Sequence, residues 1–266
     1  MATSRSVRRP AAPQPAYVLQ RHDWSESSLI VELFTRGLGR VVTVARGAKK
    51  PTSNYRPLLL PFQPVMVMLG APPKAAEDGA DRELLPLRSA EWAGGQPLVR
   101  GAALFSAFYL NELLLKGLAR QDPHEALFDA YAAALAALAS LPTARDEPAV
   151  LRAFELVLLR ETGLLPDLSV ATLTAEPLAE DGSYALDATH GLVAAVQGPS
   201  GARWVALEAA LGVAQGARRF EALRSTCQGV AGSLRRPLQG LLHYHLGHTP
   251  MRTREVWQGV QTLLPT

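Results

Sequence analysis

Residues 35–51 read TRGLGRVVTVARGAKKP, a short apolar strand pattern between two turns that carries five cations and no acid. Gly37 and Gly39 mark a tight turn at its start. The alternation of Val42 and Val44 is typical of a strand with one buried face. Upstream, SSLIVELFT shows the same period of two. These two runs predict a β-hairpin that leads into a basic bend.

Working outward from this hairpin, five short strands are expected before residue 95. Each is rich in Val, Leu or Ile, and turn residues separate them. Five strands in about 75 residues favour a small barrel, of which the OB type is the commonest choice. An SH3-like barrel or a small sandwich has the same pattern and stays open. The expected strands are 16–22, 27–35, 39–47, 64–70 and 84–92.

Beyond Pro97 the apolar residues recur at helical spacing. A helix is expected over 97–119, another over 123–141 with Asp122 as its cap, and a third over 147–162 that ends at Gly163. Segment 166–201 reads as a small irregular β excursion, and 203–264 as helices broken at glycines and Pro250. The predicted fold class is therefore α+β and multidomain: a basic disordered tail at 1–15, a barrel domain at 16–95 and a mainly α-helical domain at 96–266.

The net charge of +3 hides an uneven distribution. Residues 1–60 hold ten Lys and Arg against three acids, and residues 215–266 hold seven Arg against two acids, so the segment between them is acidic. Basic ends of this kind point to a polyanionic partner, although a compositional bias toward Arg would give the same counts. The single cysteine, Cys227, excludes an intramolecular disulfide and a cysteine-cluster zinc site, and no apolar run reaches the length of a membrane span.

Motifs for catalysis are missing from the sequence. It has neither a G-x-x-x-x-G-K-[ST] phosphate loop nor a G-x-S-x-G nucleophile elbow, and no pair of acids is singled out as general acid and base. The histidines of HYHLGH, 243–248, lack the further ligand that zinc requires. We therefore expect no enzyme activity, no cofactor and no metal, and the motif search disfavours the third class, an unrecognised hydrolase.

The basic bend has a clearer chemical meaning. If the strand ends near Gly47, the cations before and after it are expected to lie on one rim of the barrel, where they would neutralise phosphates of a nucleic acid. Tyr55, Phe62 and Trp24 are within reach as stacking rings; Phe34 and Phe62 are expected in the core, and Tyr55 to be exposed. The predicted DNA-binding residues are Arg36, Arg40, Arg46, Lys49, Lys50, Tyr55 and Arg56.

Several segments, in order, closely resemble the RecO family of bacterial recombination mediators. They begin with VLQRHDWSESSLIVELFTRGLGRVVTVARGAKKP and continue with LLPFQPVMV, LRSAEW, FSAFYLNELLLKGLARQDPHEALFDAY, FELVLLRETGLLPDL and LHYHLGHTPMRTRE. The resemblance runs from about Tyr17 to Trp257. It implies a DNA-repair factor without enzyme activity, in which an OB fold that binds single- and double-stranded DNA is joined to a helical domain.

The resemblance also implies partners. Members of the family engage the single-stranded-DNA-binding protein, anneal strands and work with RecR to load RecA, which places this protein in the cytoplasm at the nucleoid. Their helical domain holds the acidic C-terminal tail of the single-stranded-DNA-binding protein. The matching positions here are Arg152, Leu156 and Leu159, with Arg160 as a further candidate.

The region 170–200 differs from part of this family. Some family members bind zinc through four cysteines in the region that corresponds to 170–200, and this chain has none there. The excursion is therefore expected to fold without metal.

The main alternative function is a protein–protein scaffold in a repair complex, with a structural OB barrel and DNA held by a partner.

Overall fold

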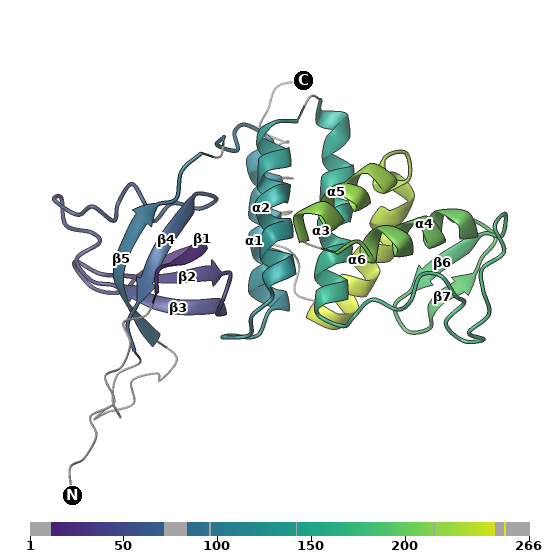
Figure 1. Ribbon diagram of the computed structural model, residues 1–266, viewed down its shortest axis with the longest axis horizontal. Helices are drawn as coiled ribbons and strands as arrows, with labels where there is room; N and C mark the ends of the chain where they lie inside the picture. The colour runs from purple at the N-terminus through teal and green to yellow at the C-terminus, as the bar shows by residue number, and fades with distance from the viewer. Residues whose placement is uncertain are drawn as a thin grey trace, which may run out of the picture. The chain divides into compact units, whose positions relative to one another are not determined.

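A computed structural model describes residues 12–71, 84–95, 97–141, 143–214, 216–247 and Thr253. The chain divides into two compact units, Met1–Gly95 and Gln96–Thr266, which we call the barrel unit and the helical unit (Figure 1). Most residues of the predicted basic tail at 1–15 fall outside the described residues.

The barrel unit is a closed five-stranded barrel with strand order β1-β2-β3-β5-β4. Neighbouring strands pair antiparallel except β3 and β5, which run parallel. This confirms the predicted OB-type barrel and its five strands. β1 already begins at Gln14, so the last residues assigned to the tail belong to the sheet and pair with β4. The strands are β1 Gln14–Asp23, β2 Leu29–Thr35, β3 Gly39–Ala45, β4 Pro64–Leu69 and β5 Leu84–Trp92.

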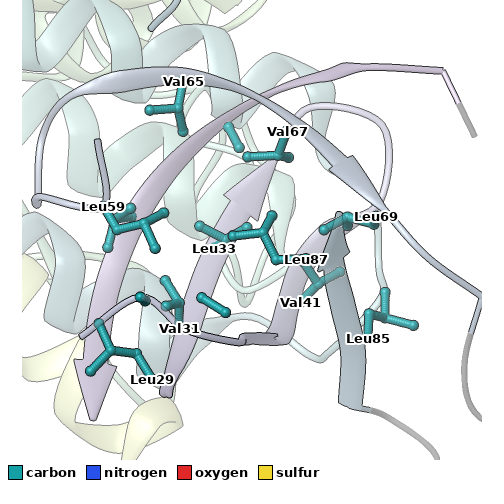
Figure 2. Close-up of a cluster of buried hydrophobic side chains, with 14 residues drawn as sticks. Leu29, Val31, Leu33, Val41, Leu59, Val65, Val67, Leu69, Leu85 and Leu87 are labelled. Atoms are coloured by element: carbon teal, nitrogen blue, oxygen red, sulfur yellow. The ribbon is translucent and has the colours of Figure 1, made fainter. Parts of the chain in front are cut away.

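Aliphatic side chains from all five strands fill the barrel (Figure 2). Leu29, Val31 and Leu33 point inward from β2, as their alternation predicts. The prediction for β3 was wrong by one residue, because Val41 and Ala45, not Val42 and Val44, join the core. The register that pairs Leu33 with Val41 imposes this choice.

The buried residue between them on β3 is polar, yet its hydroxyl is satisfied. Thr43 is fully buried, and its Oγ1 donates to the backbone oxygen of Val31 at 3.1 Å. A buried hydroxyl without such a partner would cost free energy. The hydrogen bond therefore lets β3 keep a threonine on the inner face of the barrel.

The described residues of the helical unit form six α-helices, and the bounds of α3 match the predicted segment to within one residue. α3 is buried on nearly every side and opens with Pro148 in its first turn. It ends before Gly163, whose φ of 71° requires a residue without Cβ. The helices are α1 Ala103–Gly117, α2 Glu125–Ala139, α3 Glu147–Glu161, α4 Gly201–Leu211, α5 Gly216–Cys227 and α6 Ala231–Leu246.

Two predicted helix starts were wrong. α1 begins at Ala103, so the segment that follows Pro97 is not helical. α2 begins at Glu125 after His124, and the carboxylate of Asp122 contacts the His124 ring at 3.3 Å instead of capping the helix. Proline marked a boundary in both cases, but the helix starts two to six residues later.

The excursion at 166–200 folds around two short strands, β6 Tyr184–Asp187 and β7 Gly191–Ala194. Trp204 of α4 is fully buried and its Nε1 donates to the backbone oxygen of Tyr184, which ties β6 to the helices. Thr172 exchanges hydrogen bonds with the backbone of Leu192. Among the described residues no three His, Cys, Asp or Glu side chains cluster closely enough to hold a metal ion.

Candidate nucleic-acid interface

A hollow of about 410 Å³ lies at the end of β3, between the basic bend and β5. The side chains of Arg46 and Lys50 come from the bend and that of Arg88 from β5, and all three are exposed. No carboxylate lines the hollow within the described part of the chain. We call these three cations and Tyr55, which completes the wall, the basic hollow.

Turns position the bend. Gly47 adopts a φ of 73°, and its carbonyl accepts a hydrogen bond from the backbone of Lys50 at 3.1 Å. Ala48 is buried in the barrel core, which anchors the bend, while Lys50 stays exposed. Leu59 is also buried and returns the chain to the core. The cations between these anchors therefore project from a segment that is held at both ends.

Tyr55 differs from its prediction. It is half-buried and packs against the barrel core, so it is not the exposed stacking ring that the sequence suggested. Its hydroxyl donates to the backbone oxygen of Arg88 at 3.1 Å. Burial raises the pKa of Tyr55 above its ordinary value. Tyr55 thus joins the bend to β5 beside the cations.

The five cations of residues 35–51 do not share one rim, and that prediction was wrong. Arg36 and Arg40 lie at the β2–β3 turn, whereas Arg46 follows the far end of β3. Six residues of strand separate Arg40 from Arg46 by about 20 Å. Arg40 is half-buried, and its Nη1 lies 3.6 Å from the carboxylate of Glu32 on β2. Arg40 therefore contributes to the sheet surface and not to the basic hollow.

Lys49 turns away from the hollow toward the β1–β2 loop. Its Nζ donates to the backbone oxygen of Ser25 at 3.0 Å and lies 3.2 Å from the carboxylate of Asp23. Arg56 is exposed on the bend, outside the hollow. Phe34 is fully buried, as predicted, and Phe62 is half-buried.

Arg88 was missed because its segment lies far along the sequence. LRSAEW was interpreted as a strand, but nothing local to it indicates which bend it meets. The parallel pairing of Val44 with Pro86 places Arg88 just past the end of β3, beside Arg46. Only closure of the barrel reveals this neighbour.

A second pocket, also of about 410 Å³, lies within the helical unit among α1, α3 and α6. Phe105, Tyr109 and Leu151 supply its larger apolar surfaces, and Arg152 and Arg235 supply its cations. Glu147 also lines it and accepts a hydrogen bond from the hydroxyl of Ser106. We call this cavity the helical pocket.

Arg152 is held by a buried acid. Its guanidinium donates to Oε1 of Glu155, and the hydroxyl of Tyr109 donates to the same oxygen at 2.8 Å. Glu155 is fully buried, and desolvation raises its pKa although the Arg152 charge acts in the opposite direction. The Nε of Arg152 and the Oε2 of Glu155 have no hydrogen-bond partner in the described part of the chain. The ion pair thus cancels much of the Arg152 charge at the pocket wall.

Only one of the four predicted tail-binding residues lines this pocket. The α3 residues that face it come from the first turns of the helix, whereas Leu156 and Leu159 lie further along and are fully buried in the core. Arg160 forms an ion pair with Glu208 of α4 at 2.6 Å. None of these three residues lines the helical pocket, and their role in tail binding stays a prediction. The sequence analysis did not identify Arg235 of α6 as a residue of this pocket, because the residue spacing along α3 gives no information about α6.

Comparison with known proteins places both units in one family. A family model described as "Recombination protein O N terminal" matches residues 12–75, and one described as "Recombination protein O C terminal" matches residues 100–255. DNA repair protein RecO of Variovorax paradoxus (strain S110) is 49% identical over 260 residues, which cover 94% of this chain and 96% of that protein. Its counterpart in Polaromonas naphthalenivorans (strain CJ2) is 48% identical over 254 residues, with 94% and 97% covered. In Delftia acidovorans the identity is 45% over 272 residues, with 99% and 100% covered. Family models that match in both units, together with relatives that are 45–49% identical over at least 94% of the chain, show that the chain belongs to the RecO family of DNA repair proteins.

Proposed function

We propose that this protein is a recombination mediator without enzyme activity that binds single- and double-stranded DNA through the basic hollow. The observation that supports this most is the convergence of Arg46, Lys50 and Arg88 on one exposed hollow that no carboxylate of the described residues lines. Each phosphate that meets such a cation releases condensed counterions, and this release drives binding without regard to sequence.

The same chemistry suits strand annealing. Three cations that contact only phosphates read no base edges, and so they do not oppose pairing between two bound strands. A mediator of this kind has to hold strands of any sequence. The proposed interface therefore relies on charge and not on base recognition.

Direct DNA binding is tested by anisotropy titration of a labelled thymidine oligonucleotide with the full chain. We expect Arg46→Glu with Arg88→Glu to abolish most binding at low salt, because repulsion replaces two phosphate contacts. Arg36→Glu, a charge reversal at the other end of β3, is the matched control and should bind nearly as tightly as the wild type. A wild-type chain that binds neither single- nor double-stranded DNA would refute this function and favour the scaffold alternative.

The helical pocket is proposed to take the acidic C-terminal tail of the single-stranded-DNA-binding protein. Phe105, Tyr109 and Leu151 offer apolar and aromatic surface for a terminal aromatic side chain, and Arg235 offers an exposed guanidinium for carboxylates. Arginine binds carboxylates well because its planar donors match two oxygens at once. Since Glu155 already engages Arg152, we assign the principal charge contact to Arg235.

A labelled peptide with several acidic residues and a terminal phenylalanine tests this site. Arg235→Ala should weaken the peptide about 10-fold or more, the loss expected for a hydrogen bond to a charged group. Arg236→Ala is the matched control, because Arg236 is exposed on the same helix and does not line the pocket. Equal losses for both variants would show that net charge, and not the helical pocket, governs peptide binding.

Assembly with RecR, and through it the loading of RecA, is proposed from family membership alone. We likewise propose that the protein works in the cytoplasm, at the nucleoid. No helix in the described part of the chain is long and apolar enough to cross a membrane. Co-sedimentation of the full chain with purified RecR, with and without DNA, would test the assembly directly.

A further inference from the structure

Trp24 stands at the surface of the barrel unit and is 60% exposed. It opens the β1–β2 loop, residues 24–28, which closes on itself: the backbone of Trp24 donates to the oxygen of Ser28 at 3.2 Å, and Ser28 donates back to the hydroxyl of Ser25. Because of these hydrogen bonds, the loop is an ordered turn that presents an indole to solvent. Exposing this large apolar ring to water costs free energy.

The loop is fastened to the basic bend by Lys49. The backbone of Lys49 donates to the oxygen of Ser27 at 3.0 Å, and its Nζ donates to the oxygen of Ser25. Trp24 therefore directly precedes Ser25, which is hydrogen-bonded to Lys49 of the bend. The residue after Lys49, Lys50, lines the basic hollow. The ion pair between Lys49 and Asp23 also reduces the repulsion that this acid would exert on a nearby phosphate.

The surroundings of Trp24 do not resemble an apolar docking surface. Its neighbours in sequence, Asp23 at the end of β1 and Ser25 and Glu26 on the loop, are polar and exposed. Protein partners bury contiguous apolar patches, whereas a nucleic-acid base needs only one flat ring beside a cationic track. Trp24 is an exposed indole on a loop that is hydrogen-bonded to the bend, which matches the second requirement.

We propose that Trp24 is a stacking residue for an unpaired base of the strand held at the basic hollow. The inference rests on the proposed DNA-binding function and adds a basis for discrimination. In a duplex the faces of the bases are already stacked on one another, so the indole has no partner there. Trp24 therefore adds affinity for single strands only, while the cations serve both forms.

Three ligands of equal length separate stacking from charge: a thymidine strand, an abasic strand with the same backbone, and a duplex. Trp24→Ala should weaken the thymidine strand roughly 5- to 150-fold, the range expected for loss of one base–aromatic stack. The same variant should leave the abasic strand and the duplex within about twofold of the wild type, since neither offers an unpaired base. Trp24→Phe, which keeps a ring, should recover most of the loss.

Trp92→Ala is the matched control, because Trp92 is 65% exposed in the same unit but lies at the end of β5, away from the β1–β2 loop. An equal loss for all three ligands, or no loss for the thymidine strand, would overturn the stacking role. A wild-type chain that binds none of the three would instead overturn the proposed DNA-binding function, and the stacking role with it. Equal melting temperatures for the wild type and the variants would show that a loss of binding is not caused by a loss of folding.

Discussion

The salt dependence of DNA binding gives the most direct measure of the basic hollow. The perturbation is the double substitution Arg46→Ala with Arg88→Ala, which removes two of the three cations that line the hollow. Both side chains are exposed, and neither forms an ion pair among the described residues. The change should therefore leave the barrel folded while it removes phosphate contacts.

The magnitude follows from the number of phosphates neutralised. For a single strand, the slope of log K against log salt is about −0.7 for each phosphate contact, so the three cations together contribute about −2.1. The double variant should be shallower than the wild type by about 1.4. Between 50 and 200 mM salt, each lost contact changes the fall in affinity by about 2.6-fold, and two change it by about 7-fold.

The assay is an anisotropy titration of one labelled thymidine oligonucleotide at four or more salt concentrations. Arg36→Ala serves as the control, because Arg36 lies at the opposite end of β3. Its slope should equal that of the wild type. If Arg36→Ala flattened the slope as much as Arg88→Ala did, the hollow would not be the phosphate site, and the whole basic surface would act together.

Three further predictions concern packing, hydrogen bonding and pH. Leu33 is fully buried in the barrel, so Leu33→Ala should lower the free energy of unfolding by about 2–5 kcal/mol in a urea melt, whereas Leu98→Ala, at a half-exposed site, should change it little. Tyr55→Phe removes the hydrogen bond to the backbone of Arg88 and should cost about 1 kcal/mol by the same measurement; an unchanged midpoint would mean that the hydroxyl does not join the bend to β5. Burial raises the pKa of Glu155, so the folded state holds its proton more tightly than the unfolded state does, and the stability gained is complete below about pH 4.5 and lost as the pH rises through the raised pKa. Glu155→Gln removes this titration, and its urea midpoint should fall less than that of the wild type between about pH 5 and about pH 8; parallel curves would contradict the raised pKa.

Local periodicity was sufficient to predict where the strands lie, but not to predict which side chains of each strand face the core. In β2, apolar Leu29, Val31 and Leu33 alternate with other residues, and the inward face follows at once. In β3, apolar residues occupy both phases, because Val41 faces the core while Val42 on the other face is 93% buried as well. A strand whose two faces are both buried shows no alternation between apolar and polar residues. Its register is therefore set only by its pairing with β2.

The sequence by itself determined the five-stranded barrel, most helices and the concentration of cations after β3, because each of these depends on short-range periodicity and turn residues. The tertiary structure decided which cations share a surface. Barrel closure brings Arg88 beside Arg46 and Lys50, and the length of β3 separates Arg40 from them. Packing around α3 likewise buried Leu156 and brought Arg235 of α6 to the helical pocket. Such neighbours depend on which elements pair and pack across long stretches of chain, and the local sequence carries no signal for that choice.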